Sequence, residues 1–561
     1  MEIYFSSLSK LGLEFVNVSR KFKIFLGIST GLLLGIAFPP VPTGVTALIA
    51  FVPFFLLLST LDNYGSTFRY TYFTIFIFNL ITTYWTGGFV HFKDWYMMVA
   101  GLLLIIAHPL FFIVPAFVWL FIRKQFGFKI SLFVFPFIWV GFEYLHGIGD
   151  LGFPWLTIGN TQTYDLSVIQ VASITGVYGI SFWILWINVL IFLLLVKIFL
   201  KEWNISDKKS ILLLSTILII YFLPKYYGSM VIENKSSEEN NHILVSVIQP
   251  NIDTFEKWTV DPTMPLNILQ DQMNEIRSVH PDLVLWPETA IPFYILQPQN
   301  IYYLNQLKQL VNSFDVHLLT GIPDITYYPS SGQFPKSSKT SKNGDRYDSF
   351  NSSMLISPRD QNIQKYAKIV LVPFAERVPF SEELSFLNIM EWNFGLGGWG
   401  YGRDTTVFEM KIRSGEIVKF SNLICYESVF PTFVNTFVKN GAEFLTVITN
   451  DSWWGNTSGA YQHKQIAIMR AVENRRWVVQ CANGGISCYI DPYGNIIQES
   501  DMYVKAILSQ KIEPRTDITF YTRYGDWLAE ICIVISLFFI VATISGKFYK
   551  TLRKRDYNGI H

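Results

Sequence analysis

Long apolar stretches fill the first 227 residues of the chain and return once near its end. A helix that crosses the hydrocarbon core of a bilayer needs about 20 mostly apolar residues. We therefore predict a multi-span α-helical membrane bundle of about eight transmembrane helices, seven of them before residue 228. The spans are expected at 22–38, 44–60, 69–90, 96–122, 130–146, 167–197, 210–227 and 527–546.

Residues 228–526 have a different pattern. The polar segment 233–241 (ENKSSEENN) is followed by short β-branched runs that alternate with amphipathic stretches. Strands that alternate with helices are typical of a layered α/β domain, and several of these runs are apolar throughout, as strands buried on both faces are. The Ser- and Lys-rich stretch 328–348 is expected to be a mobile loop. Strands are predicted at 242–249, 282–288, 316–323, 351–357, 421–427, 444–451, 477–483 and 486–491.

The composition agrees with a membrane protein. Hydrophobic residues make up 50% of the chain and charged residues 16%, whereas a soluble domain has about 25% charged residues. The net charge of +1 gives no sign of a nucleic-acid partner. The chain thus divides into a transmembrane domain (1–227), an α/β domain (228–526) and a C-terminal helix with a basic tail (527–561).

Basic residues in the short loops predict the orientation of the bundle. They fall in alternate loops together with the N-terminus, and the intervening loop 147–166 has no Lys or Arg. We expect the basic loops and both termini to be cytoplasmic and residues 228–526 to lie outside. In a bacterium, that is the periplasmic side of the cytoplasmic (inner) membrane. The basic residues are Arg69, Arg123, Lys124, Lys129, Lys197, Lys201, Lys208, Lys209, Lys547, Lys550, Arg553, Lys554 and Arg555.

Three residues next to apolar runs carry the parts needed to form and break a thioester. Cys425 follows FSNLI, Glu288 follows DLVLWP and Lys368 precedes IVLVPF. A thiol must lose its proton to attack a carbonyl, and Glu288 is a candidate base for that step. An ammonium at Lys368 would stabilise the oxyanion of the tetrahedral intermediate. Taken singly, they also fit a core cysteine, a turn glutamate and a surface lysine.

Two neighbouring positions leave alternatives open. Lys365 competes with Lys368, because spacing alone does not separate them. Glu376 lies in a stiff turn between two prolines, where it orients Lys368, helps to relay protons, or forms a simple ion pair with Arg377 or another cation.

The four cysteines do not predict a metal site or a disulfide framework. They lie far apart, with few histidines near them, whereas zinc sites need closely spaced ligands. A bridge between Cys481 and Cys488, which flank a short Asn-Gly-Gly-Ile turn, stays open but is the less favoured alternative.

The order and context of Glu288, Lys368 and Cys425 are similar to the Glu-Lys-Cys triad of the nitrilase (carbon–nitrogen hydrolase) superfamily. Within that superfamily the chain resembles the apolipoprotein N-acyltransferases, and the resemblance covers nearly its whole length. Ala375 and Arg377 depart from the family pattern, which usually has glycine and an aromatic residue there. The shared motifs are FEYLHG, GFPWLTIGNTQ, VIQPNI, KW, LWPETAIP, LVPFAE, ICYES, TNDSWWG, QHKQIAIMRAVEN and NGGIS.

The resemblance implies a nitrilase-like αββα sandwich for the outer domain. It also implies that Glu288 is the general base, Lys368 the oxyanion stabiliser and Cys425 the nucleophile that carries the acyl group. The further matches are Glu376, Tyr426 and Glu427, which the family needs for activity, and Trp258, which helps to place substrate. No metal or organic cofactor is implied.

The family reaction has two steps. An acyl chain passes from the sn-1 ester of a phospholipid, typically phosphatidylethanolamine, to the cysteine thiol. The α-amino group of the diacylglyceryl-cysteine of an apolipoprotein then attacks the thioester, which completes lipoprotein maturation. The expected partners are therefore a phospholipid acyl donor, a diacylated apolipoprotein acceptor and membrane lipid, and we expect a monomer.

Two loops are candidates for the path of the substrate. The stretch 391–402, which contains Trp399, is rich in glycine and aromatic residues and fits either a mobile lid or an ordinary glycine-rich loop. Phe153 and Trp155 lie in the loop expected on the same side and are candidates for the opposing wall. Glu143, near the end of a span, is expected to pair with backbone groups or with His146.

Two other functions compete with acyl transfer to an amine. A membrane-tethered amidase or nitrilase would use the same triad but release its acyl group to water. The helical bundle argues against it, because an enzyme for small polar amides has no reason to carry one. A transporter or receptor is disfavoured because the spans have few buried charges.

Overall fold

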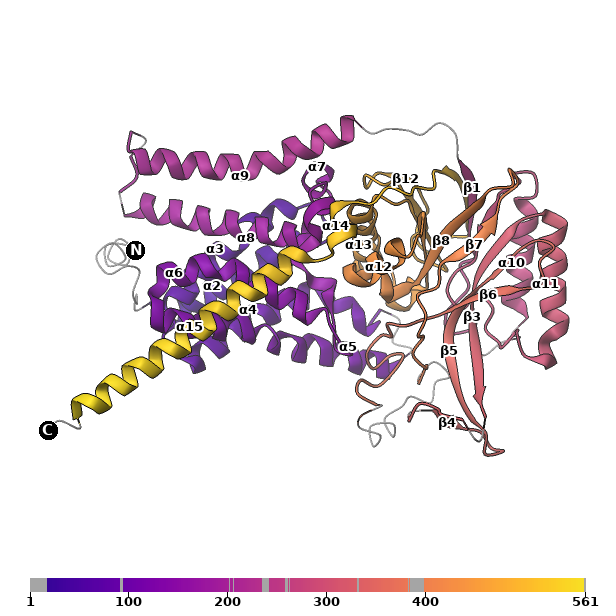
Figure 1. The fold of residues 1–561 in the computed structure, drawn as a ribbon, viewed down its shortest axis with the longest axis horizontal. Helices are drawn as coiled ribbons and strands as arrows, with labels where there is room; N and C mark the ends of the chain where they lie inside the picture. The colour runs from indigo at the N-terminus through magenta and orange to yellow at the C-terminus, as the bar shows by residue number, and fades with distance from the viewer. Residues whose placement is uncertain are drawn as a thin grey trace.

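The computed structural model describes residues 18–558, except 91–93, 201, 205, 235–241, 258–260, 262, 330–331, 337, 382 and 384–397. A bundle of helices and an α/β domain lie end to end (Figure 1). The chain enters the bundle first, continues into the α/β domain, and returns along the bundle through its last helix.

Long helices form the bundle, and most of the predicted spans correspond to one of them. Four stretches are long and apolar enough to cross a membrane: 95–146, Ala172–Phe199, Lys208–Glu233 and Trp527–Phe548, while Gly44–Ser59 is a shorter apolar helix. Polar caps mark several starts, since Ser19, Asn63 and Asp207 each accept a hydrogen bond from the first turn of a helix. The helices are α2 (Arg20–Ala37), α3 (Ala47–Ser59), α4 (Tyr64–Thr83), α5 (Trp95–Ala107), α6 (Ile113–His146), α8 (Ala172–Phe199), α9 (Lys208–Glu233) and α15 (Trp527–Asn558).

The predicted single helix over 96–122 is wrong. Helix α5 ends at Ala107, a 3₁₀ turn that contains Pro109 follows, and α6 begins at Ile113. Proline lacks the N–H that a continuous helix needs, so the break falls there. The predicted break between residues 122 and 130 does appear: Gly127 (φ 79°, ψ 172°) has a non-helical conformation that glycine adopts without strain, and it divides α6 into two helical arms.

The kink of α6 lies at the end of the bundle far from the α/β domain. Arg123 Nη1 donates to the carbonyl oxygen of Leu58, near the end of α3, at 2.7 Å. Lys547 Nζ, near the end of α15, lies 4.1 Å from the ring centroid of Phe121. The ends of α3 and α15 and the turn of α6 therefore share one end of the bundle, where many basic residues gather.

The start of α6 lies at the opposite end, together with both ends of α5. His108, which follows α5, lies 4.9 Å from His146 and 5.0 Å from Phe153 between ring centroids. The carbonyl oxygen of Trp453 in the α/β domain approaches Gly88, just before α5. Helix α5 thus begins and ends near the α/β domain, and the two arms of α6 run away from that domain and back.

The α/β domain has two sheets packed face to face. One has the order β13-β1-β2-β3-β5-β4, with β6 also paired to β5, and the other has the order β12-β11-β10-β9-β8-β7. In Figure 1, α10 (Met264–Glu275) and α11 (Ile301–Phe314) cover the first sheet, while α12 (Pro431–Lys439) and α13 (Ser458–Asn474) lie between the second sheet and the bundle. The layers therefore follow an αββα order.

The predicted strands all appear, and others add to them. β1, β2 and β3 pair in parallel, as do β8, β9 and β10, so the carboxyl ends of these strands share one edge of each sheet. The bounds are β1 (Ile243–Gln249), β2 (Leu283–Leu285), β3 (His317–Tyr328), β4 (Lys339–Thr340), β5 (Arg346–Ile356), β6 (Ile363–Ala367), β7 (Phe408–Lys411), β8 (Ile417–Ile424), β9 (Phe444–Thr449), β10 (Val478–Ala482), β11 (Cys488–Ile490), β12 (Ile496–Glu499) and β13 (Ala506–Ile512).

The structure decides two predictions about this domain: the loop over 328–348 and the bridge between Cys481 and Cys488. A loop over all of 328–348 is wrong at both ends, because β3 and β5 continue as a hairpin whose last pair is Tyr328 with Arg346. Cys481 and Cys488 are both free and buried. The Cys481 Sγ instead lies 3.4 Å from the carbonyl oxygen of Leu285.

One glutamine joins the α/β domain to the bundle. Gln462 on α13 accepts hydrogen bonds at Oε1 from the indole N–H groups of Trp85 (3.1 Å) and Trp155 (2.8 Å). Its Nε2 donates to the carbonyl oxygens of Pro39 and Thr82, each at 3.1 Å. The amide thereby satisfies four buried polar groups from three separate parts of the bundle.

Candidate active site

Glu288 lies just beyond the carboxyl end of β2. Its Oε1 accepts a hydrogen bond from Asn351 Nδ2 at 2.7 Å and lies 3.5 Å from Lys368 Nζ. The side chain is buried, so its carboxylate faces these two groups and little water. The strand end places Glu288 at the edge where the sheets open, as expected for a site residue in an α/β fold.

Lys368 follows β6 and is almost fully buried. Its Nζ lies 2.9 Å from both carboxylate oxygens of Glu376. Glu376 Oε2 also accepts from the backbone N–H of Val372 at 2.8 Å, which fixes the carboxylate. The partner of Glu376 is therefore Lys368 and not Arg377, which donates to the carbonyl oxygen of Trp399.

Cys425 occupies a sharp turn after β8. It has a φ of 53°, in the left-handed region that non-glycine residues seldom adopt, and it begins the 3₁₀ turn Cys425–Val429. His463 Nε2 lies 3.2 Å from the Cys425 carbonyl oxygen and 2.7 Å from Ser428 Oγ. These contacts support the turn, consistent with a structural histidine. Backbone strain of this kind is often retained at functional sites.

The ionisable groups of Glu288, Lys368 and Cys425 shift one another's pKa values. Burial raises the pKa of the Cys425 thiol well above its usual value, and Glu288 adds to this while Lys368 opposes it. Burial also raises the pKa of Glu288, against the opposing effect of Lys368. For Lys368, burial alone would lower the pKa, but the carboxylates of Glu376 and Glu288 raise it above its usual value. The resting site thus holds a protonated thiol beside a charged ammonium.

Glu427 ties the nucleophile turn to the loop of Lys368. Its Oε1 accepts from the Tyr366 hydroxyl and from the backbone N–H of Ile369, both at 2.7 Å, and its Oε2 accepts from the N–H of Ile424 at 2.8 Å. Burial raises the pKa of Glu427 to about 7, although these hydrogen bonds oppose the shift. Its contacts are those of a residue that holds two catalytic segments together.

Tyr426 connects the site to the bundle. Its hydroxyl donates to the carbonyl oxygen of Gly152 at 2.9 Å. Its ring lies 6.4 Å from the rings of both Phe153 and Trp155, and it is nearly parallel to Trp155. Phe153 and Trp155 thus lie beside the residue that follows the nucleophile, and the bundle forms one side of the site.

The remaining predicted residues lie in different places. Trp258 falls outside the described residues, as does 391–397 of the glycine-rich stretch. Trp399 is buried, and its backbone N–H donates to the carbonyl oxygen of Glu376 at 3.1 Å. Lys365 is half exposed and pairs with Asp324 at 2.7 Å, so it is not part of the site.

Sequence reasoning missed two residues beside Glu288. Asn351 Nδ2 donates to Glu288 and also to Glu376 Oε1, at 3.0 Å. Lys257 Nζ donates to the carbonyl oxygen of Glu288 at 3.1 Å. A lysine in the KW motif and an asparagine that starts an apolar strand were the available signals, but neither indicates which partner the side chain reaches.

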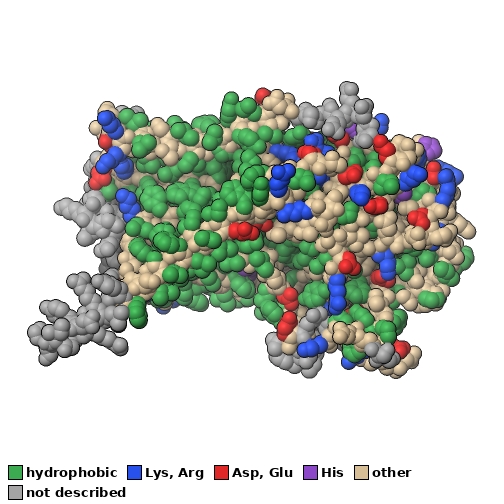
Figure 2. All heavy atoms as spheres, in the orientation of Figure 1, with side chains coloured by type: hydrophobic (Ala, Val, Ile, Leu, Met, Phe, Trp, Pro, Cys, Tyr) green, Lys and Arg blue, Asp and Glu red, His purple; other side chains and the backbone are tan. Residues whose placement is uncertain are grey.

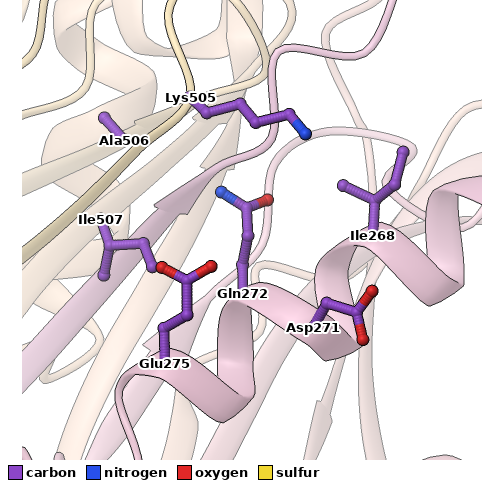
Figure 3. Close-up of a pocket in the computed structure, with 7 residues that line it drawn as sticks. All are labelled: Ile268, Asp271, Gln272, Glu275, Lys505, Ala506 and Ile507. Atoms are coloured by element: carbon purple, nitrogen blue, oxygen red, sulfur yellow. The ribbon is translucent and has the colours of Figure 1, made fainter.

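A surface cavity of about 260 Å³ lies elsewhere on the α/β domain (Figure 3). Carboxyl groups from α10 and an ammonium beside β13 line it, and none of the residues around Cys425 contributes. The active site is therefore identified by its chemistry rather than by this hollow. The lining residues are Ile268, Asp271, Gln272, Glu275, Lys505, Ala506 and Ile507.

Comparison with known proteins gives matches over both halves of the chain. Residues 30–190 match the family described as apolipoprotein N-acyltransferase N-terminal domain, and residues 244–516 match the carbon–nitrogen hydrolase family. The latter agrees with the αββα layers. A nitrilase-superfamily protein from Saccharomyces cerevisiae, Nit3, is 18% identical with a TM-score of 0.36, and the alignment covers 50% of this chain and 93% of that one.

Relatives match nearly the whole length. The apolipoprotein N-acyltransferase of Chlorobaculum tepidum is 36% identical over 520 residues, which are 91% of this chain and 95% of that protein. The enzyme of the same name from Geobacter metallireducens is 31% identical, over 91% of this chain and 92% of its own. Together with the two family matches, these relatives show that the chain is an acyltransferase that belongs to the apolipoprotein N-acyltransferase family.

Proposed function

We propose that the protein moves a fatty acyl group from a phospholipid to the Cys425 thiol, and from there to the N-terminal amine of an apolipoprotein. In the first step, Glu288 takes the thiol proton while the sulfur attacks the carbonyl carbon of the sn-1 ester of phosphatidylethanolamine. Lys368 stabilises the oxyanion. The C–O bond then breaks, Glu288 returns the proton to the leaving alcohol, and lysophospholipid departs.

The second step uses the same residues. The α-amino group of a diacylglyceryl-cysteine attacks the thioester carbonyl, and Glu288 takes a proton from the attacking nitrogen. The C–S bond breaks, the thiolate regains the proton, and the amide product leaves. A thioester suits this order because it reacts readily with amines, and a site with little water slows its hydrolysis.

The contact between Tyr426 and the bundle is the observation that carries this proposal. The residue next to the nucleophile hydrogen-bonds Gly152 and packs beside Phe153, both in the loop that follows α6. An enzyme for a small soluble amide would not need its active site beside a membrane bundle. A lipid ester and a lipid-anchored peptide, both held at the membrane, arrive from this side.

We also propose that the bundle crosses the membrane eight times. The two arms of α6 each count as one crossing, and α5, whose ends both lie near the α/β domain, does not cross. The face drawn in Figure 2 supports a lipid environment, because hydrophobic side chains cover the bundle while charged groups concentrate on the α/β domain and at the far end of the bundle. The remaining crossings are α2, α3, α4, α8, α9 and α15.

The sides of the membrane follow from the basic residues. Arg123 and Lys547 lie at the end of the bundle far from the α/β domain, which by the positive-inside rule is the cytoplasmic end. We infer that the α/β domain, residues 228–526, is periplasmic, that both termini are cytoplasmic, and that the protein acts as a monomer in a bacterial inner membrane.

Reconstitution with phosphatidylethanolamine and a diacylglyceryl-cysteine peptide tests the reaction. The peptide amine should become an amide, with release of lysophospholipid. Without the peptide, lysophospholipid should reach only about one equivalent per enzyme, because the thioester has no acceptor. Continuous release of fatty acid and an unmodified peptide would show that water is the acceptor and that the protein is a hydrolase.

A further inference from the structure

Lys257 is a buried lysine that contacts the backbone of Glu288 and the side chain of Thr289. It belongs to the loop after β1, and its side chain is nearly inaccessible to solvent. The Nζ donates to the carbonyl oxygen of Glu288 at 3.1 Å and to Thr289 Oγ1 at 2.9 Å. The two contacts are therefore made to the two residues that share the Glu288–Thr289 peptide bond.

That peptide lies in a strained turn. The N–H of Ala290 donates to the carbonyl oxygen of Pro287 at 3.2 Å, which closes a four-residue turn with Glu288 and Thr289 at its centre. Thr289 has a φ of 45°. A left-handed residue at the third position is the pattern of type II turns, which favour glycine or asparagine there, whereas a β-branched residue is unfavourable.

The turn is confined on its other side by β3. Gly321 donates its N–H to the carbonyl oxygen of Pro287 at 3.2 Å. A Cβ at Gly321 would collide with the backbone nitrogen of Thr289, so only glycine permits this approach. The Glu288 peptide is therefore held between a close-packed strand and the ammonium group of Lys257.

We propose that Lys257 is a positioning residue for the general base: its two hydrogen bonds hold the Glu288–Thr289 peptide in the left-handed turn that aims the Glu288 carboxylate. The inference rests on the proposed role of Glu288 as the base. The carboxylate must stay within reach of Asn351, at 2.7 Å, and Lys368, at 3.5 Å, and a flip of the following peptide would redirect it.

The protonation of Lys257 does not alter this role. Burial lowers the pKa of Lys257 to about 7, against the opposing effect of Glu288. An amine keeps two N–H donors after it loses a proton, and two are sufficient for the contacts to Glu288 and Thr289.

The test is a rescue experiment on the full-length protein in phosphatidylethanolamine vesicles. Lys257→Met removes both donors and should slow single-turnover acylation of Cys425 by about 10²-fold, with little change in the KM for phospholipid. Lys257→Met combined with Thr289→Gly should recover most of the rate, because glycine adopts the turn without support. Lys419→Met, which removes an exposed lysine that pairs with Glu409, is the matched control and should match the wild type.

The outcomes separate the alternatives. A double variant as slow as Lys257→Met, or a Lys257→Met that changes only KM, would overturn the proposal. Should Lys257→Met fail to fold, Thr289→Val provides the second test: it keeps the strain and loses the hydroxyl contact, so it must acylate more slowly than Thr289→Gly, and the reverse order refutes the proposal. A wild-type protein whose thiol is alkylated but never acylated would instead refute the proposed function.

Discussion

Gln462 and His463 are neighbours on α13, yet they bind groups on opposite sides of the joint between the domain and the bundle. Gln462 hydrogen-bonds four groups of the bundle, including Trp155 at 2.8 Å. His463 Nε2 lies 3.2 Å from the carbonyl oxygen of Cys425. Two adjacent residues of α13 therefore contact the membrane bundle and the backbone of Cys425.

Gln462→Leu should lower both thermal stability and acylation of Cys425 from phospholipid. The change removes the hydrogen-bond partner of the buried Trp155 indole N–H and of the Pro39 carbonyl oxygen, and each unpaired group costs about 1–3 kcal/mol. Alkylation of Cys425 by iodoacetamide should stay close to wild type, because the thiol itself is untouched. Gln465→Leu, on the same helix, is the control, since its Oε1 has no hydrogen-bond partner in the described part of the chain. Equal effects of both variants on acylation would contradict a specific role for Gln462.

Asn351→Ala should move the acid limb of the acylation rate profile to higher pH. Glu288 acts as a base only when ionised, and burial has already raised its pKa above the usual 4.5. The Asn351 hydrogen bond favours the ionised form and lowers that pKa, so its removal raises the pKa further. The rate should then fall at a higher pH as acid is added. A profile that overlays the wild type would show that Asn351 does not act on Glu288.

Lys368→Met should reduce acylation of Cys425 by about 10²- to 10³-fold, the effect typical for the loss of one oxyanion donor. Lys365→Met is the matched control and should acylate at nearly the wild-type rate, because Lys365 pairs with Asp324 away from the site. Single-turnover acylation measures both. The opposite order of rates would assign the oxyanion role to Lys365.

A fatty acyl group should appear on Cys425 and on no other cysteine. Glu288 and Lys368 act on the Cys425 thiol, whereas burial raises the pKa of Cys488 to about 12 and Lys464 opposes the shift only in part. Mass spectrometry before and after hydroxylamine detects the thioester, and Cys425→Ala should abolish it. A thioester on Cys481 or Cys488 would refute this assignment.

Reporter fusions should place residue 240 outside the cytoplasmic membrane and His561 inside it. Seven crossings before the α/β domain require the first result, and one crossing after it requires the second. A second pair of fusions at Asp94 and Phe111 should give the same side, because α5 does not cross. Opposite sides for that pair would show that α5 does cross the membrane.

The sequence pointed to the three candidate residues Glu288, Lys368 and Cys425, but not to the side chains that contact them. Glu288 and Cys425 each follow an apolar strand, and a strand end is a local signal. Lys365 and Lys368 lie three residues apart on such a run, and only the folded chain shows that one is half exposed and the other buried. The contact of Asn351 with Glu288 joins residues far apart in the chain, and no local pattern encodes it.

The prediction of the membrane helices was limited in the same way, because local sequence does not encode contacts between distant residues. Apolar composition marks a segment that avoids water, but it does not give the direction of the segment. The run 96–122 is apolar enough for one crossing, yet Pro109 divides it into a short helix near the α/β domain and the first arm of α6. Only contacts such as those of His108 with His146 and Phe153 reveal the turn.

The hydrogen bond from Tyr426 to Gly152 makes bilayer thickness a variable of catalysis. A bundle whose apolar length does not match the surrounding lipid tilts to compensate. Gly152 would move with it, and the 2.9 Å contact would pass that movement to the backbone one residue from the reactive sulfur. In the proposed reaction the acyl chains of the membrane are thus both the reactant and the surroundings that set the geometry of the site, so a cell that shortens or lengthens its lipids would also adjust the enzyme.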